Sequence, residues 1–556
     1  MSKDRLVYLP LGGAGEIGMN AYVYGVGAAG RERLILVDLG LTFPDMDSTP
    51  GVDLILPDID WLAERRDRLE AIFVTHAHED HVGAVAHLYD RLGVPVYARG
   101  FTANIARAKM AEQGHPERAV HTSGAWPETV EAGPFKVGFV PISHSIPESS
   151  GLVIDTDLGR IVHSGDYKMD TDPVVGEPFD EALWASLAEP GVTALVCDST
   201  NVFSPHAGRS ESSLGPELEA AIARAKGMFV ATTFASNIAR VKTLAEAARR
   251  SGRSVCLMGR AMRRMIEAGV ETGVLTDFPH TIPPEDARDI PRENVMLIVT
   301  GSQGERRAAS AQLARGKYQG ITLKAGDTFL FSSKTIPGNE RGVIRIMNQM
   351  SELGVDVIDD TSGLYHVSGH ANRPDLERLH RLIRPRAVVP MHGEHRHLRE
   401  HVKLAGLGGF HAVLAPNGTL VDLSAEPARV VEHVEAGRVY LDGQMKIGAL
   451  DGVVRDRIRM ALGGHVMVNV ILDEEDECLG EPWCETRGLA ETGRSGAALV
   501  DVLEDELGQV LSRVGRRVLA DDDRLEEALR KAARQTALAE IGKKPEVTVI
   551  VSRLTA

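Results

Sequence analysis

The chain has 556 residues, of which 43% are hydrophobic and 25% are charged, and its formal net charge at pH 7 is −16. This length exceeds one ordinary domain, so the sequence predicts two or three domains with enough apolar residues for a core in each. The acidic balance argues against a protein that coats nucleic acid through charge alone, although it does not exclude a nucleic-acid enzyme with a local basic lining.

Membrane and secretion signals are not found in the sequence. There is no uninterrupted apolar run of about 18 residues, the length that a membrane-spanning helix needs, and residues 1–5 are not followed by the apolar region of a signal peptide. The four cysteines form no CxxC pair, so we expect reduced thiols rather than a disulfide framework or a thiolate zinc site. These features predict a cytoplasmic protein without a membrane partner.

The N-terminal region holds a glycine-rich segment at residues 13–18 that matches GxGxxG and follows a strand-like run at residues 6–9. A dinucleotide site would need a helix after the last glycine. Residues 20–27 instead show a β pattern with glycines and no helical period. We therefore predict a hairpin with a glycine-rich bend and reject a Rossmann site.

A dense histidine motif follows the apolar residues 71–74, which are predicted to form a buried strand. It reads HxHxDH and contains His76, His78, Asp80 and His81. These side chains are costly to desolvate unless something pairs with them, and a divalent metal is the usual partner. Alternation along the loop sends the first two histidines to one side, and the other two side chains turn away as a helix begins. The spacing favours two adjacent ions, and the competing interpretation is a polar strand-to-helix turn.

Three further apolar runs end in a candidate ligand. Residues 34–37 precede Asp38, residues 139–143 precede His144, and residues 160–165 precede Asp166. Alone, each polar residue after a strand is more often a turn former or a helix cap than a functional residue. In this order, and together with HxHxDH, these three residues are a strong indication of a metal site.

With these motifs in this order, the sequence resembles the metallo-β-lactamase superfamily. The resemblance implies that one metal ion is held by three histidines, namely His76, His78 and His144. It also implies that a second ion is held by Asp80 and His81, that Asp166 bridges the two ions, and that Asp38 orients the cluster without binding metal.

The middle of the chain, about residues 209–365, reads as a second α/β domain. Helices are predicted at residues 218–225 and 235–249, and strands at residues 228–232 and 295–300. A later strand, residues 387–391, again ends in a histidine, His392. If His392 completes the metal site, the second α/β domain is inserted into the first.

The C-terminal region changes in composition from about residue 465. An acidic run at residues 473–477 precedes a charged amphipathic helix at residues 524–541 and a strand at residues 546–551. These elements predict a small α+β domain, for which oligomerisation is a plausible role.

Three later motifs narrow the resemblance to the β-CASP branch, whose members are nucleases. They contain Asp198 in the segment 195–201, His370 in the segment 365–371 and His392 in the segment 390–395. Their order, the insertion and the SGH and MHGE segments resemble bacterial members of the ribonuclease J family over about residues 5–450. Within this branch, histidine at the position of His392 goes with RNA substrates, whereas DNA-processing members tend to have valine. The resemblance adds His392 to the ligands of the second metal ion.

The resemblance implies an α/β fold, a metallo-β-lactamase αββα sandwich with an inserted α/β β-CASP domain and a small α+β C-terminal domain. The expected boundaries are residues 1–208 and 366–448 for the discontinuous metallo-β-lactamase domain, 209–365 for the β-CASP domain, 449–464 for a linker and 465–556 for the C-terminal domain. Related nucleases can carry a structural cation away from the active site, and Asp53 and Asp442 are candidates for holding one.

The expected reaction is hydrolysis of RNA phosphodiesters by a two-metal ribonuclease. Two ions can activate a water and neutralise the non-bridging phosphoryl oxygens. His370, hydrogen-bonded to Asp198, could protonate the leaving 3′ oxygen, because a nearby carboxylate favours the imidazolium. We therefore expect catalytic roles for Asp80, Asp198 and His370. The products would be a 5′ phosphate and a 3′ hydroxyl.

A terminal 5′ phosphate bound near the metals would make the enzyme a 5′-to-3′ exonuclease with endonuclease activity, acting in RNA maturation and decay. The expected substrate-binding residues are His366, Val367, Ser368, Gly369 and His370, whose hydroxyl, imidazole and backbone N–H groups can hold phosphate. Further candidates lie in the segment 331–339, namely Ser332, Ser333, Lys334 and Gly338, and an ordinary turn is an equally good interpretation of that segment.

Zinc is the metal that the histidine-rich ligand set favours, and the carboxylate donors also suit manganese. The expected partners are single-stranded RNA, preferably with a 5′ monophosphate, and a second copy of the chain in a homodimer or tetramer formed through the C-terminal domain.

Three alternatives stay open, namely a β-CASP DNA nuclease, a small-molecule metallo-hydrolase and a non-catalytic scaffold. Histidines outside the motifs, among them His206, are expected to be surface or core residues.

Overall fold

The computed structural model describes residues 4–554 of the chain. Within this range the chain forms two compact units, one made of the residues up to Thr42 and of Leu56–Arg438, the other of Phe43–Ile55 and the residues from Val439 onward. None of the helices in residues 4–554 combines the length and the apolar content needed to cross a bilayer.

The larger unit contains two β-sheets that share one core. The first sheet has the order β23-β22-β1-β3-β4-β6-β7-β8. Its strands are β1 (Arg5–Gly12), β3 (Ala21–Gly27), β4 (Arg33–Val37), β6 (Leu69–Val74), β7 (Val96–Ala98), β8 (Val120–Thr122), β22 (Thr419–Asp422) and β23 (Arg429–His433). β1 and β3 are antiparallel neighbours, with Tyr8 opposite Tyr24. The glycine-rich segment between them therefore belongs to a hairpin, as the sequence predicted.

The second sheet has the order β21-β19-β13-β12-β11-β10-β9. Its strands are β9 (Val130–Ala132), β10 (Phe135–Pro141), β11 (Ser150–Thr156), β12 (Gly159–His163), β13 (Ala194–Asp198), β19 (Ala387–Met391) and β21 (His411–Ala412). Strands β12, β13 and β19 are parallel neighbours. Since parallel strands end at the same edge of a sheet, the residues that follow these three strands are brought together.

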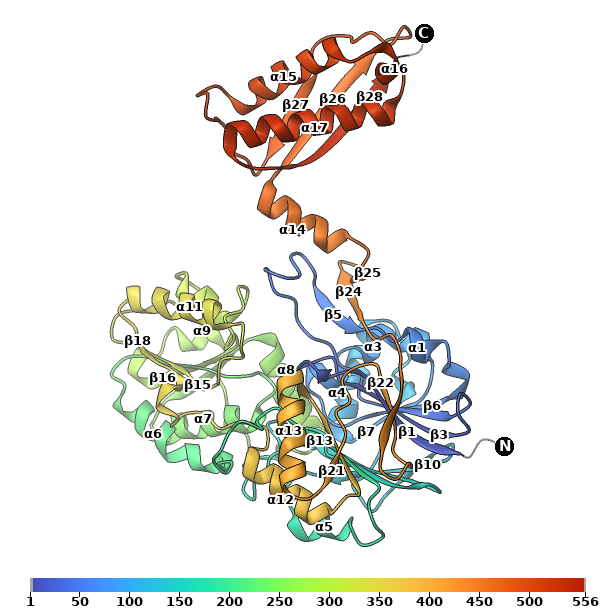
Figure 1. Cartoon of the computed structure of the whole chain (residues 1–556). Coiled ribbons are helices and arrows are strands. Elements are labelled where there is room, and N and C mark those ends of the chain that lie inside the picture. Colours follow the sequence, from blue (N-terminus) through green and yellow to red (C-terminus); the bar gives the residue numbers. More distant parts are fainter. Residues whose placement is uncertain (1–3, 555–556) are drawn as a thin grey trace. The chain divides into compact units, whose positions relative to one another are not determined.

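Apolar side chains from both sheets meet in a single buried cluster that includes Phe73 of the first sheet and Val137 and Val196 of the second. Helices cover the outer faces. α3 (Val85–Leu92) and α4 (Gly100–Glu112) lie against the first sheet, and α5 (Glu181–Ser186), α12 (Arg373–Ile383) and α13 (His395–Leu407) against the second (Figure 1). The order of layers is helix, sheet, sheet and helix, which is the αββα sandwich that the resemblance implied.

A third sheet is formed entirely by residues between Phe229 and Ile358. It is parallel throughout and has the order β15-β16-β14-β17-β18. Its strands are β14 (Phe229–Thr232), β15 (Ser254–Met258), β16 (Val295–Val299), β17 (Thr328–Phe331) and β18 (Asp356–Ile358). β16 is apolar and fully buried along its length, as expected for a parallel strand covered on both faces.

Helices lie on both faces of this third sheet (Figure 1). They are α6 (Gly215–Arg224), α7 (Ile238–Arg250), α8 (Arg260–Glu271), α9 (Pro284–Ala287), α10 (Ala309–Ala314) and α11 (Glu340–Glu352). The third sheet and its helices lie inside the stretch 209–365 that the sequence predicts to be inserted, and the exact domain boundaries remain a prediction.

The smaller unit contains the sheet β27-β26-β28, in which β26 (His465–Leu472) is antiparallel to β27 (Trp483–Arg487) and parallel to β28 (Glu546–Arg553). α15 (Leu499–Arg513) and α17 (Asp522–Ile541) pack against it, and the short α16 (Arg516–Leu519) lies between them in the chain (Figure 1). This is an α+β arrangement, as predicted for the C-terminal region.

In chain order, β23 is followed by β24 (Arg438–Asp442), β25 (Met445–Gly448) and α14 (Val453–Gly463). β24 also pairs with β5 (Leu54–Pro57). The residues 449–464, expected to be a linker, thus contain a helix. The Asp442 carboxylate accepts from Arg457 Nη2 at 2.5 Å, and Asp53 Oδ2 accepts from the Gly443 amide at 2.8 Å. Among the described residues, neither aspartate belongs to a group of three or more ligand side chains. A cation held by this pair remains a prediction, for which these contacts offer no support.

Truncation of Leu503 is expected to destabilise the C-terminal fold. Its side chain is fully buried on α15, one turn from the buried Leu499 and Leu507, in the cluster that joins the helices to the sheet. Leu503→Ala should lower the free energy of unfolding of this region by about 2–5 kcal/mol, measured by amide hydrogen exchange in β26. Glu506→Ala changes an exposed residue of the same helix and is the control. Equal exchange in both variants would contradict this packing.

Candidate metal centre

The predicted ligands lie at the ends of strands. The loop after β6 carries His76 and His78, and the short helix α2 (Glu79–Val82) begins directly after them. His144 follows β10, Asp166 follows β12, and His392 follows β19. Asp166 and His392 lie close together because β12, β13 and β19 are parallel neighbours. The packing of the two sheets against each other brings the loop after β6 to the same place.

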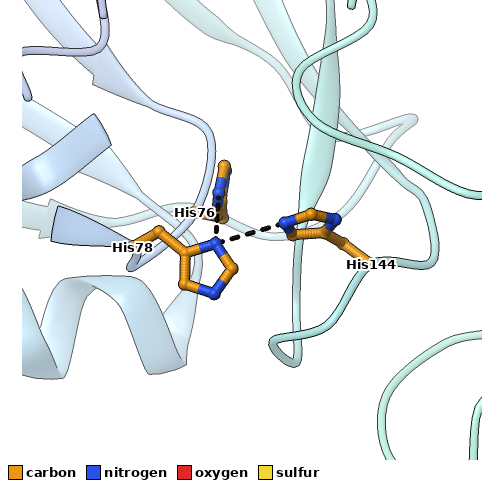
Figure 2. A group of neighbouring side chains, drawn as sticks. All are labelled: His76, His78 and His144. Atoms are coloured by element: carbon orange, nitrogen blue, oxygen red, sulfur yellow. Dashed lines mark hydrogen bonds between the residues drawn. The ribbon is translucent and has the colours of Figure 1, made fainter. Parts of the chain in front are cut away.

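Three histidines form the first group. Figure 2 shows the rings of His76, His78 and His144 turned toward one another, the first two from the β6 loop and the third from the loop after β10. His78 Nδ1 lies 3.0 Å from His76 Nε2 and 3.2 Å from His144 Nε2. A single shared proton can satisfy only one of these two nitrogen pairs, whereas a cation among the three nitrogens can be bound by all of them.

The second group consists of Asp80, His81, Asp166 and His392, whose ligand atoms all lie within 4.8 Å of one another. Asp166 Oδ2 is 3.1 Å from His81 Nε2 and 3.0 Å from His392 Nε2. The same oxygen is 3.9 Å from His76 Nε2, a member of the first group. Asp166 therefore lies between the two groups, where a bridging ligand would be expected.

Two buried atoms at this centre are available to bind a cation. Asp166 Oδ1 and His392 Nε2 are buried and have no partner in hydrogen-bond geometry among the described residues. Burial lowers the pKa of His78 to about 4 although the charge of Asp80 opposes it, and burial also lowers the pKa of His76 and of His144. Neutral imidazoles are the form that binds metal. The donor set of nitrogen and carboxylate oxygen therefore fits divalent metal ions.

A second layer of residues orients these ligands. Asp38 Oδ2 lies 2.7 Å from His81 Nδ1, and Asp38 Oδ1 accepts from the Thr75 amide at 2.8 Å. Asp38 thus contacts His81 and the β6 loop and belongs to neither ligand group; its role in orienting the cluster remains a prediction. Asn20, which sequence reasoning missed, donates through Nδ2 to the Asp80 carbonyl at 2.9 Å, and Tyr22 donates to Asn20 Oδ1 at 2.6 Å. The available signal for Asn20 was its position after the glycine-rich bend.

His370 and Asp198 form a pair at the edge of this centre. His370 Nδ1 lies 2.8 Å from Asp198 Oδ2 and 3.9 Å from Asp166 Oδ2. Burial lowers the pKa of His370, but the opposing charge and hydrogen bond of Asp198 outweigh it and raise the pKa to about 9. The imidazolium is therefore the favoured form of this ring. The Thr200 amide donates to Asp198 Oδ1 at 2.8 Å and fixes the carboxylate.

A pocket of about 250 Å³ opens beside His370. Its lining includes four of the five predicted substrate-binding residues, namely His366, Val367, Ser368 and His370. It also includes Lys168, His206 and Arg209, which sequence reasoning did not select. Asp170 also lines the pocket and pairs with Lys168 at 2.9 Å, so the pocket presents the Arg209 guanidinium and the Ser368 hydroxyl next to the candidate metal centre.

Individual residues of the segment 366–370 differ in what they contact. The Ser368 hydroxyl oxygen accepts from Asn201 Nδ2 at 2.7 Å, which leaves its proton available to a ligand. His366 Nδ1 is buried without a partner among the described residues, and burial together with nearby cations lowers the pKa of this ring to about 3.

Gly369 does not line the pocket; its carbonyl lies 2.5 Å from His144 Nδ1. A Cβ at Gly369 would lie 2.9 Å from the His144 ring, so this close approach requires glycine.

Four protein-family models match successive parts of the chain. They describe the metallo-beta-lactamase superfamily (residues 15–194), the ribonuclease J beta-CASP domain (residues 226–350), the Zn-dependent metallo-hydrolase RNA specificity domain (residues 356–416) and the ribonuclease J C-terminal domain (residues 452–554). Together they cover the two-sheet sandwich, the inserted sheet and the C-terminal region.

Similar proteins of known name align over most of their length. A ribonuclease J of Sinorhizobium meliloti is 41% identical over 99% of this chain and 98% of its own. A ribonuclease J of Mycolicibacterium smegmatis is 36% identical over 94% of this chain and 92% of its own. A crystal structure of a protein of unknown function from Enterococcus faecalis aligns with a TM-score of 0.50 at 16% identity, covering 77% of this chain and 100% of that chain, which bears on the fold alone.

Proposed function

Because this chain belongs to the ribonuclease J family and is a metal-dependent ribonuclease, we propose that it degrades single-stranded RNA from the 5′ end with two divalent ions and also cuts internally. The observation that carries this proposal is the convergence of the two ligand groups on Asp166, next to a pocket lined by Arg209 and Ser368. A small-molecule hydrolase or a DNA nuclease is not favoured, since the matches include an RNA specificity domain and ribonuclease J domains.

The roles of the ligands follow from their grouping. We assign His76, His78 and His144 to one ion and Asp80, His81 and His392 to the other, with Asp166 shared. When bound, the ions would supply a hydroxide at neutral pH and neutralise charge on the phosphoryl oxygens. Zinc suits the histidine-rich set best, and manganese is compatible with its carboxylates.

The leaving 3′ oxygen needs a proton when its bond to phosphorus breaks. His370 is the candidate donor, because Asp198 holds its Nδ1 at 2.8 Å, so Nε2 is the ring nitrogen that would face a substrate. Transfer of this proton to the 3′ oxygen would give a 3′ hydroxyl on one product and a 5′ phosphate on the other. Each cleaved RNA would then carry the 5′ phosphate that the next round requires.

The pocket beside His370 is proposed to bind the terminal 5′ monophosphate. The exposed Arg209 offers positive charge, and Ser368 offers a hydroxyl donor. A charged terminal phosphate next to the metal centre would fix the distance from the RNA end to the cleaved bond, so that single nucleotides are released. An RNA bound without its end in the pocket would be cut internally.

Assembly and location are proposed on separate grounds. Leu450, Leu462 and Met445 in the smaller unit are 96%, 70% and 68% exposed, and such apolar side chains favour association of this region in a homodimer or tetramer. All four cysteines are free thiols, which is usual in the reducing cytoplasm, where we expect the enzyme to act.

The proposed function is tested by a time course on a 3′-labelled single-stranded RNA that bears a 5′ monophosphate, with zinc or manganese supplied. Stepwise shortening from the 5′ end with release of mononucleotides is the expected result. A 5′-hydroxyl RNA of the same sequence should be shortened more slowly and serves as the control. Discrete internal fragments alone would replace the exonuclease assignment by an endonuclease, and intact RNA under every metal condition would overturn the proposal.

A further inference from the structure

Four charged side chains are buried where the chain passes between the two-sheet sandwich and the third sheet, and none of them belongs to a candidate ligand group. Lys168, Asp170, Glu211 and Arg240 are 3%, 4%, 2% and 0% exposed. They come from the loop after Asp166, from the 3₁₀ helix η3 (Glu211–Leu214) and from α7. Charges buried to this degree are costly unless they are paired, so their arrangement requires an explanation.

These four side chains, called here the buried charge network, neutralise one another. Arg240 donates through Nε and Nη2 to both carboxylate oxygens of Glu211, at 2.5 and 3.0 Å. Lys168 Nζ lies 2.9 Å from Asp170 Oδ2, and the same oxygen accepts from the Glu211 amide at 2.9 Å. Two positive and two negative charges are thus linked through one bidentate pair and one shared carboxylate oxygen.

Arg240 also binds two backbone carbonyls, one directly after β17 and one in the segment that follows β18. Its Nη1 donates to the Ser332 carbonyl at 2.7 Å and to the Tyr365 carbonyl at 3.2 Å, and the Ser332 hydroxyl donates to the same Tyr365 carbonyl at 2.7 Å. Glu211 lies where the chain leaves the sandwich for the third sheet, and Tyr365 lies where it returns. One guanidinium therefore ties both connecting segments together.

Both ends of the network reach the RNA pocket. Lys168 and Asp170 line the pocket directly, and Tyr365 immediately precedes the lining residue His366. We propose that Arg240, through Glu211, is a positioning residue that holds the segment 366–370 in register with the metal centre. This inference rests on the proposed function of that segment in binding RNA.

If Arg240 served stability alone, replacing another buried arginine of this region should have the same effect. The chain offers such an arginine as a matched control. Arg253 is 6% exposed, and within residues 4–554 its side chain donates to backbone carbonyls alone, those of Gly227, Val295, Ile222 and Ala225. None of these four carbonyls belongs to the pocket or to the two connecting segments. Arg240→Lys and Arg253→Lys therefore make the same chemical change at two buried sites with different contacts.

The variants are compared in the full chain with its metals bound. Lysine keeps the charge but cannot reproduce the bidentate pair and the backbone contacts together. For Arg240→Lys we expect faster amide exchange in residues 365–370, unchanged metal content and a fall in kcat/KM on 5′-monophosphate RNA of about 10²-fold, the typical cost of misplacing a reactive group. Glu211→Gln should act in the same direction, whereas Arg253→Lys should leave both the exchange of residues 365–370 and kcat/KM near those of the wild type.

Two outcomes would overturn the inference, namely unchanged exchange of residues 365–370 in Arg240→Lys, or equal losses of kcat/KM in Arg240→Lys and Arg253→Lys. The exchange measurement needs no substrate. It therefore tests the positioning role even if the wild-type chain fails to shorten RNA, a failure that would count against the proposed function alone.

Discussion

Replacement of His76 by alanine is expected to abolish RNA cleavage while the fold survives. His76 Nε2 is 3.0 Å from His78 Nδ1 and 3.9 Å from Asp166 Oδ2, so its loss removes a donor next to the residue that joins the two ligand groups. A bound metal supplies several kcal/mol of charge stabilisation, and each 1.36 kcal/mol corresponds to about tenfold in rate. The expected loss in kcat is therefore on the order of 10³-fold or more.

Metal content and RNA cleavage are measured on the same preparation of His76→Ala, with circular dichroism as a check on the fold. His401→Asn is the matched control, because His401 is an equally buried histidine that contacts Ser199 and His380. Its nearest potential ligands are Cys197 and His380, and it belongs to neither of the two groups that meet at Asp166. The control should retain its metal and its activity even if it is less stable. Full activity of His76→Ala with an intact fold would refute the assignment of this ligand.

The ligands could be predicted because each follows an apolar strand, and strand ends are visible in the sequence. The sequence could not show which strands are neighbours, and that came from the resemblance. Asp198 and His392 are close because β13 and β19 are parallel, with Asp198 paired to Met391. No local pattern in either segment specifies this pairing.

The backbone conformation of Asp38 and of the candidate ligand His392 could not be predicted from the local sequence either. Asp38 and His392 have φ angles of +61° and +48°, in the left-handed region that most residues avoid. Their local preference would favour another conformation, so tertiary contacts such as Asp38 with His81 and Thr75 must impose this one. Strain of this kind at a functional site is invisible in composition or periodicity.

Helix positions were predicted more closely than helix starts. The helix expected at residues 235–249 is α7, which begins at Ile238 because the Asn237 side chain accepts from the Arg240 amide and caps it. The pocket residues Lys168 and Arg209 were missed for a different reason. They lie in loops without a motif of their own, and only the tertiary fold brings them to His366.

Replacement of His370 by glutamine is expected to lower kcat by about 10²–10⁴-fold, the range for loss of a general acid, without loss of metal. Glutamine keeps a polar side chain near Asp198 but cannot deliver a proton from an imidazolium. The measurement is single-turnover cleavage of RNA together with the metal content of the variant. His395→Gln makes the same change at an exposed residue that begins α13 and should leave kcat unchanged.

A substrate with sulfur in place of the scissile 3′ oxygen separates proton donation from mere positioning. A thiol ionises with a pKa near 8.5, so a thiolate leaves without help, whereas an alkoxide requires a proton. His370→Gln should therefore cleave the sulfur substrate at nearly the wild-type rate, although it is strongly impaired on the oxygen substrate. Equal impairment on both substrates would show that His370 holds the RNA or the metal cluster in place, and the proton would then have to come from another group at this centre.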